Sequence, residues 1–168
     1  MRHLYPLTLA LFALTAQAQA ADYHIATRYA VAGAGGWDYP SLDEHTHRLY
    51  IARGDHVQIV DTTTGKEIAS IADTPGVHGI VLAAELGRGY ISCGKANVVK
   101  VFDLKTNAVI ASVPAGEVPD AIMYEPATQR VFAFNGRSHD ASVIDAKTNQ
   151  SVATIALGVK PEFARADS

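Results

Sequence analysis

The side chains in this sequence that could carry chemistry lie in polar segments between short apolar runs. Carboxylates can bind Ca²⁺ or Zn²⁺ and imidazoles can bind Zn²⁺, an arginine pairs with anionic groups, and aromatic rings stack on sugars or other planar ligands. Seven residues are therefore candidates for contacting a ligand: Trp37, Asp38, Tyr39, His78, Asp120, Arg137 and Glu162.

A metal site is an alternative use for part of this set. The zinc patterns His-Glu-x-x-His and Cys-x-x-Cys do not occur, and His45 and His47 lie in a polar connection that favours a solvated loop. We therefore predict no bound metal and no cofactor. The alternative is a calcium or zinc site assembled from separate segments, with the ligands Asp38, His78, Asp120 and Glu162.

Motifs for covalent catalysis are missing from the sequence. It contains no Gly-x-Ser-x-Gly elbow, phosphate loop or dinucleotide fingerprint. Ser138, His139 and Asp140 are consecutive on a short loop, which prevents them from forming a hydrogen-bonded triad. The single cysteine, Cys93, cannot form an intramolecular disulfide and is expected to be a small buried hydrophobe. No catalytic residue is predicted.

The elements that position these residues are indicated by a repeat. The segments 48–71, 88–113 and 130–155 resemble one another, and Asp61, Asp103 and Asp145 recur within them at a constant interval. Two further series keep the same interval: Thr64, Thr106 and Thr148, and Ala69, Ala111 and Ala153. A period of about 40 residues indicates stacked supersecondary units.

Each unit is predicted to contain four short strands separated by turn residues, as in the blade of a β-propeller. The predicted fold is all-β, with antiparallel four-stranded blades at about 37–73, 77–115 and 118–157 and the start of another at 160–168. Since propellers have about four to eight blades, three blades cannot close a ring. We expect an incomplete arc, a fragment of a larger ring, whose open faces permit self-association.

Propeller geometry collects the polar residues on one face. The segment that leads into the first strand of a blade and the loop between its second and third strands open on the same side. The lead-in segments supply Trp37, Asp38, Tyr39, His78, Asp120, Lys160 and Glu162, and the loops supply Asp55, His56, Lys95, Asn97, Arg137, His139 and Asp140. A ligand is expected over this face, near the ring centre. The repeated aspartates fall at the opposite end, where they are expected to bond their own turns.

Residues 1–20 have the pattern of a cleaved signal peptide. Arg2 precedes an apolar stretch at 7–16, and Ala18-Gln19-Ala20 supplies a small-x-small cleavage pattern. Cleavage after Ala20 predicts a periplasmic or secreted protein with no membrane span, and an uncleaved anchor is the alternative. The formal net charge is −3 for the whole chain. An acidic chain without a basic stripe does not favour nucleic-acid binding.

The repeat resembles a known family. The strand Arg48-Leu49-Tyr50-Ile51 and the segment Val60-Asp61-Thr62-Thr63-Thr64-Gly65 resemble the YVTN-type β-propeller repeat. Further segments at 35–39, 73–80, 119–122 and 131–146 resemble exported bacterial YncE-like proteins, over essentially all of residues 22–168. The resemblance implies a seven-bladed ring of about twice this length. That family is largely without an established reaction, so the resemblance implies architecture more than activity.

Two functions follow as hypotheses. The first is an exported propeller scaffold that binds a protein or small ligand on its loop face and has no catalytic role, because rigid blades with variable loops are a binding design. The alternative is a metal-assisted lactone or sugar-acid hydrolase in the full-length form. The sequence leaves the partner or ligand unidentified.

Overall fold

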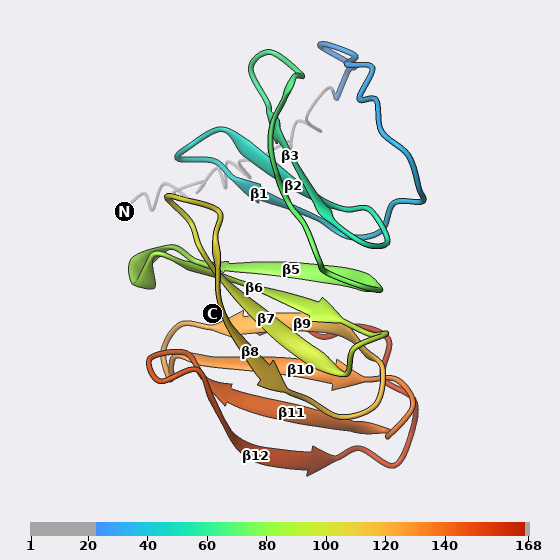
Figure 1. Ribbon diagram of the computed structural model, residues 1–168, viewed down its shortest axis with the longest axis vertical. Coiled ribbons are helices and arrows are strands. Elements are labelled where there is room, and N and C mark those ends of the chain that lie inside the picture. The colour runs from blue at the N-terminus through green and yellow to red at the C-terminus, as the bar shows by residue number, and fades with distance from the viewer. Residues whose placement is uncertain (1–22, 167–168) are drawn as a thin grey trace, which may run out of the picture.

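The computed structural model describes residues 23–166 of the chain, so the predicted signal peptide at 1–20 lies outside the described residues. Within 23–166, twelve strands form three separate four-stranded antiparallel sheets, and the strands of each sheet are adjacent in the order of the sequence. The sheets follow one another along the molecule as an open arc (Figure 1). The predicted partial propeller, with one four-stranded sheet for each copy of the repeat, is confirmed.

We call the sheets blades one, two and three. Blade one consists of β1 (Pro40–Asp43), β2 (Arg48–Ala52), β3 (Val57–Asp61) and β4 (Glu67–Ile71). Blade two consists of β5 (Val77–Ala83), β6 (Arg88–Cys93), β7 (Val98–Asp103) and β8 (Val109–Pro114), with a short 3₁₀ turn η1 (Ala84–Leu86) between β5 and β6. Blade three consists of β9 (Pro119–Glu125), β10 (Arg130–Asn135), β11 (Asp140–Asp145) and β12 (Gln150–Ala156).

The repeated aspartates shape the turn between the third and fourth strands of every blade. Asp61 Oδ1 accepts hydrogen bonds from the backbone N–H groups of Thr63 and Thr64 at 2.9 and 2.8 Å. Asp103 and Asp145 accept the equivalent bonds in blades two and three. These bonds stabilise the carboxylates and lower the pKa of each aspartate. The expected structural role of the series is confirmed, and it explains the regular interval between its members.

Apolar side chains fill the spaces between neighbouring blades. Tyr50 and Ile59 of blade one pack with Ile91 and Phe102 of blade two, and the rings of Tyr50 and Phe102 lie 5.6 Å apart. Val99 of blade two belongs to a second buried cluster that includes residues of blade three. Cys93 is fully buried in the first cluster, as predicted, and burial raises the pKa of its thiol to about 11.

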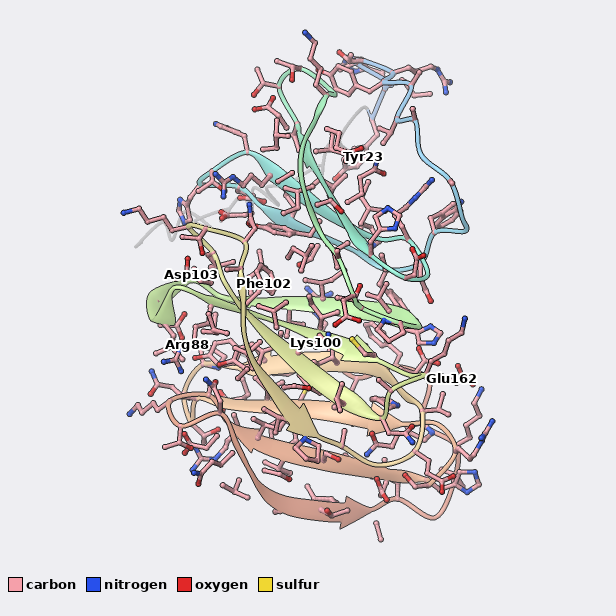
Figure 2. The ribbon with its side chains drawn as sticks, viewed as in Figure 1. Tyr23, Arg88, Lys100, Phe102, Asp103 and Glu162 are labelled. Carbon is pink, nitrogen blue, oxygen red and sulfur yellow. The ribbon has the colours of Figure 1, made fainter. Side chains whose placement is uncertain are left out.

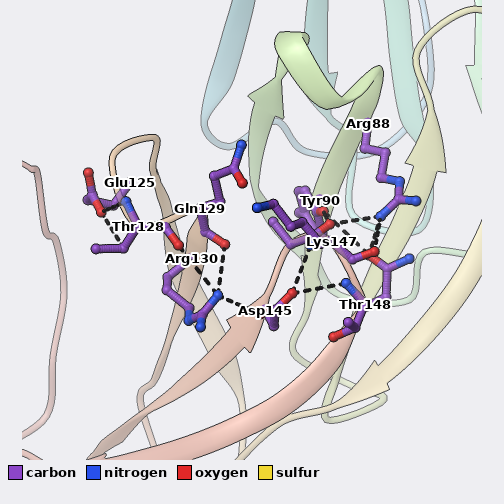
Figure 3. A network of polar contacts seen from close by, with 11 residues as sticks. Arg88, Tyr90, Glu125, Thr128, Gln129, Arg130, Asp145, Lys147 and Thr148 are labelled. Carbon is purple, nitrogen blue, oxygen red and sulfur yellow. Dashed lines mark hydrogen bonds and ion pairs between the residues drawn. The ribbon is translucent and has the colours of Figure 1, made fainter.

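In blades one and two, an arginine at the start of the second strand links the blade to the next one. Arg48 Nη1 donates to the carbonyl oxygen of Leu104 at 3.0 Å, and Arg88 Nη1 donates to the carbonyls of Ala146 and Lys147 at 2.8 and 2.9 Å. Figure 3 shows the Arg88 contacts with the turn of blade three. Charge-assisted bonds of this kind are stronger than neutral ones, so the repeated arginine is a connector between blades.

Arg130 occupies the same repeat position but stays within its own blade. Its Nη1 lies 2.6 Å from Asp145 Oδ2. Figure 3 shows this pair. The repeated residue therefore changes partner between blades two and three.

The segment before β1 runs along blade one without forming a strand (Figure 1). Tyr29 donates its hydroxyl hydrogen to the carbonyl of Thr63 at 2.8 Å, and Gln58 Nε2 donates to the carbonyl of Ala32 at 2.7 Å. Gln58 is buried. Among residues 23–166, no helix has the length and apolar character needed to cross a membrane.

Candidate functional site

The lead-in segments and the loops between second and third strands meet at one end of the blades. Backbone hydrogen bonds fix them to one another: Gly76 N–H donates to Gly54 O at 2.7 Å, and Gly94 N–H donates to Gly76 O at 2.8 Å. In blade three, Gly136 N–H donates to Val118 O at 2.8 Å. These bonds hold the loop face in one backbone arrangement.

Gly76 is required at the centre of this backbone chain. Its φ of +66° is a left-handed conformation, and an added Cβ would lie 2.7 Å from the backbone nitrogen of Lys95. A side chain at this position would push the lead-in segment of blade two away from its own loop.

A cavity of about 550 Å³ opens on this face. Its lining comes from all three blades and includes Gly36, Trp37, Asp38, Gly54, Gly76, Val77, His78, Gly94, Lys95, Asn97, Val118 and Arg137. Four of the seven predicted contact residues therefore share one cavity: Trp37, Asp38, His78 and Arg137. Trp37 is the only tryptophan of the chain, and the residue is 78% exposed.

Asp38, His78 and Asp120 meet beside this cavity, and we call them the Asp-His-Asp cluster. Asp38 precedes β1, His78 lies in β5 and Asp120 lies in β9, so each blade contributes one residue. His78 Nδ1 lies 2.8 Å from Asp38 Oδ2 and 3.9 Å from Asp120 Oδ1. One potential ligand atom from each of the three lies within 4.8 Å of the others.

The His78 ring rests against backbone. A Cβ added at Gly94 would lie 3.1 Å from both Nε2 and Cδ2 of His78, which shows how closely the ring approaches this glycine. The ring is held between this backbone and the Asp38 carboxylate.

Negative charge exceeds positive charge in the cluster. Burial raises the pKa of Asp120; His78 opposes this shift, and the nearby carboxylates of Asp38 and Glu162 add to it. Within residues 23–166, the Asp120 carboxylate accepts no hydrogen bond, although its side chain is only 23% exposed. The cluster therefore holds one carboxylate, that of Asp38, paired with the imidazole and a second that is poorly compensated.

Three of the predicted residues lie outside the cavity lining. Tyr39 contributes to a smaller cavity of about 110 Å³ together with Phe163. Glu162 is exposed and pairs with Lys160. Asp120 does not line the cavity, and its Oδ1 lies 3.9 Å from His78 Nδ1. Glu162 and the turn residue Asp103 lie on opposite sides of the molecule in Figure 2.

Lys95 also lines the cavity. It was expected on the loop face but was not among the seven predicted contact residues. A signal was present in the repeat, because Gly94-Lys95 and Gly136-Arg137 are separated by the same interval as Asp103 and Asp145. Blades two and three thus present a basic side chain at equivalent loop positions. Neither Lys95 nor Arg137 forms an ion pair within the described part of the chain.

Comparison with known proteins extends the description of the fold. No protein-family model matches the chain, and no curated protein matches its sequence. Among solved structures, the chain is similar to the hydrazine synthase of Kuenenia stuttgartiensis, with a TM-score of 0.72 and 16% sequence identity. The similarity covers 84% of this chain and 42% of that chain, so this chain spans less than half the length of its structural neighbour. At this identity the likeness shows the fold alone, an all-β structure of partial propeller type.

Proposed function

We propose that this chain belongs to an exported propeller scaffold of YVTN type, similar to YncE-like proteins, that binds a small anionic ligand on its loop face. The observation that carries the proposal is the cavity of about 550 Å³ to which all three blades contribute polar side chains. Its volume lies within the range of about 300–1,000 Å³ that is common for small-molecule sites.

The rim of the cavity supports an anionic ligand. Lys95 and Arg137 are exposed and form no ion pair with other described residues. An organic carboxylate or a phosphate would supply the missing partner, and arginine is suited to bind either through two parallel hydrogen bonds. The exposed indole of Trp37 offers a stacking surface for the organic part.

Binding is favoured over covalent catalysis by the state of the possible nucleophiles. The thiol of Cys93 is buried, and its pKa of about 11 leaves little thiolate at neutral pH. Ser138 Oγ accepts a hydrogen bond from the backbone N–H of Glu117 at 3.0 Å, which gives it a structural use. The backbone bonds between Gly54, Gly76 and Gly94 make a pre-organised binding face.

Trp37 provides the test. Its fluorescence is recorded while the protein is titrated, in EDTA, with a panel of organic acids, sugar acids and sugar phosphates, and with the matching neutral sugars. We expect saturable changes with anionic compounds, weakened about tenfold or more by Lys95→Ala or Arg137→Ala, since charge-assisted bonds contribute about 1.5–3 kcal/mol. Lys147→Ala, in a turn of blade three remote from the cavity, is the matched control. Equal responses to neutral and anionic compounds would refute the proposal.

The Asp-His-Asp cluster favours a second candidate function, the metal-assisted hydrolysis of a lactone or sugar acid. A bound metal beside the cavity would polarise a carbonyl or activate water. The test is turnover of lactones by the purified protein with added Zn²⁺ and with EDTA. Metal-dependent turnover that disappears in His78→Gln would support this candidate, and equal background rates in all samples would exclude it.

A further inference from the structure

We propose that Asp38, His78 and Asp120 bind one divalent transition-metal ion, with Zn²⁺ as the first choice, and that the ion presents an open coordination position to the neighbouring cavity. The part that concerns the cavity ligand rests on the proposed function. The metal site itself is independent of anion binding, whereas the second candidate function, metal-assisted hydrolysis, would require it.

The spacing of the donor atoms suits a small ion. Bonds of about 2.0–2.1 Å place the ligands of a tetrahedral Zn²⁺ roughly 3.3 Å from one another. The distances from His78 Nδ1 to Asp38 Oδ2 and Asp120 Oδ1, 2.8 and 3.9 Å, lie on either side of that value. The three donor atoms lie within 4.8 Å of one another, so the proposal requires side-chain rotations that bring the Asp38 and Asp120 oxygens close enough for one ion.

The type of donor selects the metal. Ca²⁺ and Mg²⁺ prefer all-oxygen sites, whereas imidazole with carboxylates suits Zn²⁺ and its neighbours in the transition series. Three protein ligands leave one position of a tetrahedral ion for water or a ligand, as in catalytic rather than structural zinc sites. Because Asp38 and His78 line the cavity, that position would be reached from it.

The balance of charge explains why Asp120 would be the third ligand of the ion. An ordinary ion pair would need only His78 and Asp38, and it leaves Asp120 without a hydrogen-bond donor from the described residues. A divalent cation would compensate both carboxylates at once. An anionic ligand could then bind between the ion, Lys95 and Arg137, because all of these border the same cavity.

The test measures metal binding without any organic ligand. The purified protein is stripped with EDTA, dialysed free of chelator and titrated with Zn²⁺ against a chromophoric competitor, and the metal content is measured after gel filtration. We expect one Zn²⁺ per chain. Asp120→Asn and His78→Gln should each weaken the affinity at least about tenfold, since even groups behind metal ligands contribute factors of about 10–100.

Two controls separate this site from others. Asp55 and His56 form a second aspartate-histidine pair on the same face, at 2.7 Å, so Asp55→Asn should leave the affinity unchanged. The double variant His45→Gln/His47→Gln tests chance binding by the polar connection of blade one. Circular dichroism verifies that each variant is folded. A variant that has lost its β spectrum is replaced by Asp38→Asn, for which the same loss of affinity is expected.

Three results would overturn the inference: no saturable Zn²⁺ binding, binding that Asp120→Asn leaves unchanged, or binding that the His45→Gln/His47→Gln variant abolishes. The anion titration in EDTA is read separately. Anion binding without metal binding would retain the proposed function and reject the metal site, and the converse result would retain the site alone.

Discussion

Asp120 is placed where its charge destabilises the folded protein. Burial and two neighbouring carboxylates raise its pKa above the unfolded value, so protonation favours the folded state and ionisation opposes it. The stability contributed by the protonated form is present at low pH and is lost as pH rises through the folded-state pKa. Residues that reduce stability in this way are typical of functional sites.

Asp120→Asn is therefore expected to stabilise the metal-free protein at pH 7. Replacing the carboxylate with a neutral amide should raise the Tm by roughly 1–2 °C, as expected for a partly exposed site. The advantage should shrink as pH is lowered, because Asp120 of the parent protein takes up its proton. Thermal denaturation in EDTA at several pH values measures this difference. Asp38→Asn is the comparison, since it removes the partner of His78 and should not stabilise. A lower Tm for Asp120→Asn at pH 7 would contradict the prediction.

The connection between blades depends on a few polar contacts as well as on the apolar clusters. Arg88 reaches two carbonyls of blade three, and Tyr90 donates to one of them, Ala146 O, at 2.9 Å. Loss of the guanidinium would leave these acceptors without their charged donor. The contacts join elements that are distant in the chain and belong to different blades, so they stabilise the arc rather than a single blade.

Arg88→Met is expected to lower the free energy of unfolding by roughly 1.5–3 kcal/mol, the range for hydrogen bonds to a charged group. Arg130→Met is the matched variant, because Arg130 pairs with Asp145 inside its own blade. Arg130→Met should lower the free energy of unfolding by less than Arg88→Met does. Urea denaturation followed by circular dichroism measures both. Equal losses, or a larger loss for Arg130→Met, would mean that the contact between blades is not the source of the stability.

At the scale of strands and turns, the sequence predicted the fold well because its signals are local. Asp61, Asp103 and Asp145 bond N–H groups two and three residues away, so their spacing marks equivalent turns without knowledge of the tertiary structure. The site is different, since Asp38, His78 and Asp120 meet only after three blades pack side by side. Residue type alone identified Asp38, His78, Asp120 and Glu162 as possible metal ligands. The structure shows that the first three lie together and that Glu162 pairs with Lys160.

At the scale of the whole molecule, several large apolar side chains are exposed. Leu42 on β1 is 50% exposed, and Val159 and Phe163 after β12 are 67% and 68% exposed. Exposed apolar surface of this kind on an open arc is a candidate contact surface. The expectation that arcs self-associate stays a prediction.

We expect the purified chain to form dimers or larger species as its concentration rises. Size-exclusion chromatography with light scattering gives the mass, and circular dichroism of the same sample verifies the β structure. Phe163→Ser should shift the equilibrium toward the monomer because it removes exposed apolar area. A folded monomer at all concentrations tested would contradict the prediction.

The backbone bonds of the loop face have a consequence for how the cavity can change. Gly76 N–H and Gly94 N–H are bonded to carbonyl groups, so the shape of the face depends little on which side chains stand beside them. Lys95 and Arg137 project from this framework at equivalent positions of two blades and are exposed. Under the proposed function, exchanging them for acidic or neutral residues would alter the charge of the ligand accepted while leaving the backbone of the face in place. The same backbone would then serve different ligands through substitution at two rim positions, which makes the face a starting point for redesign.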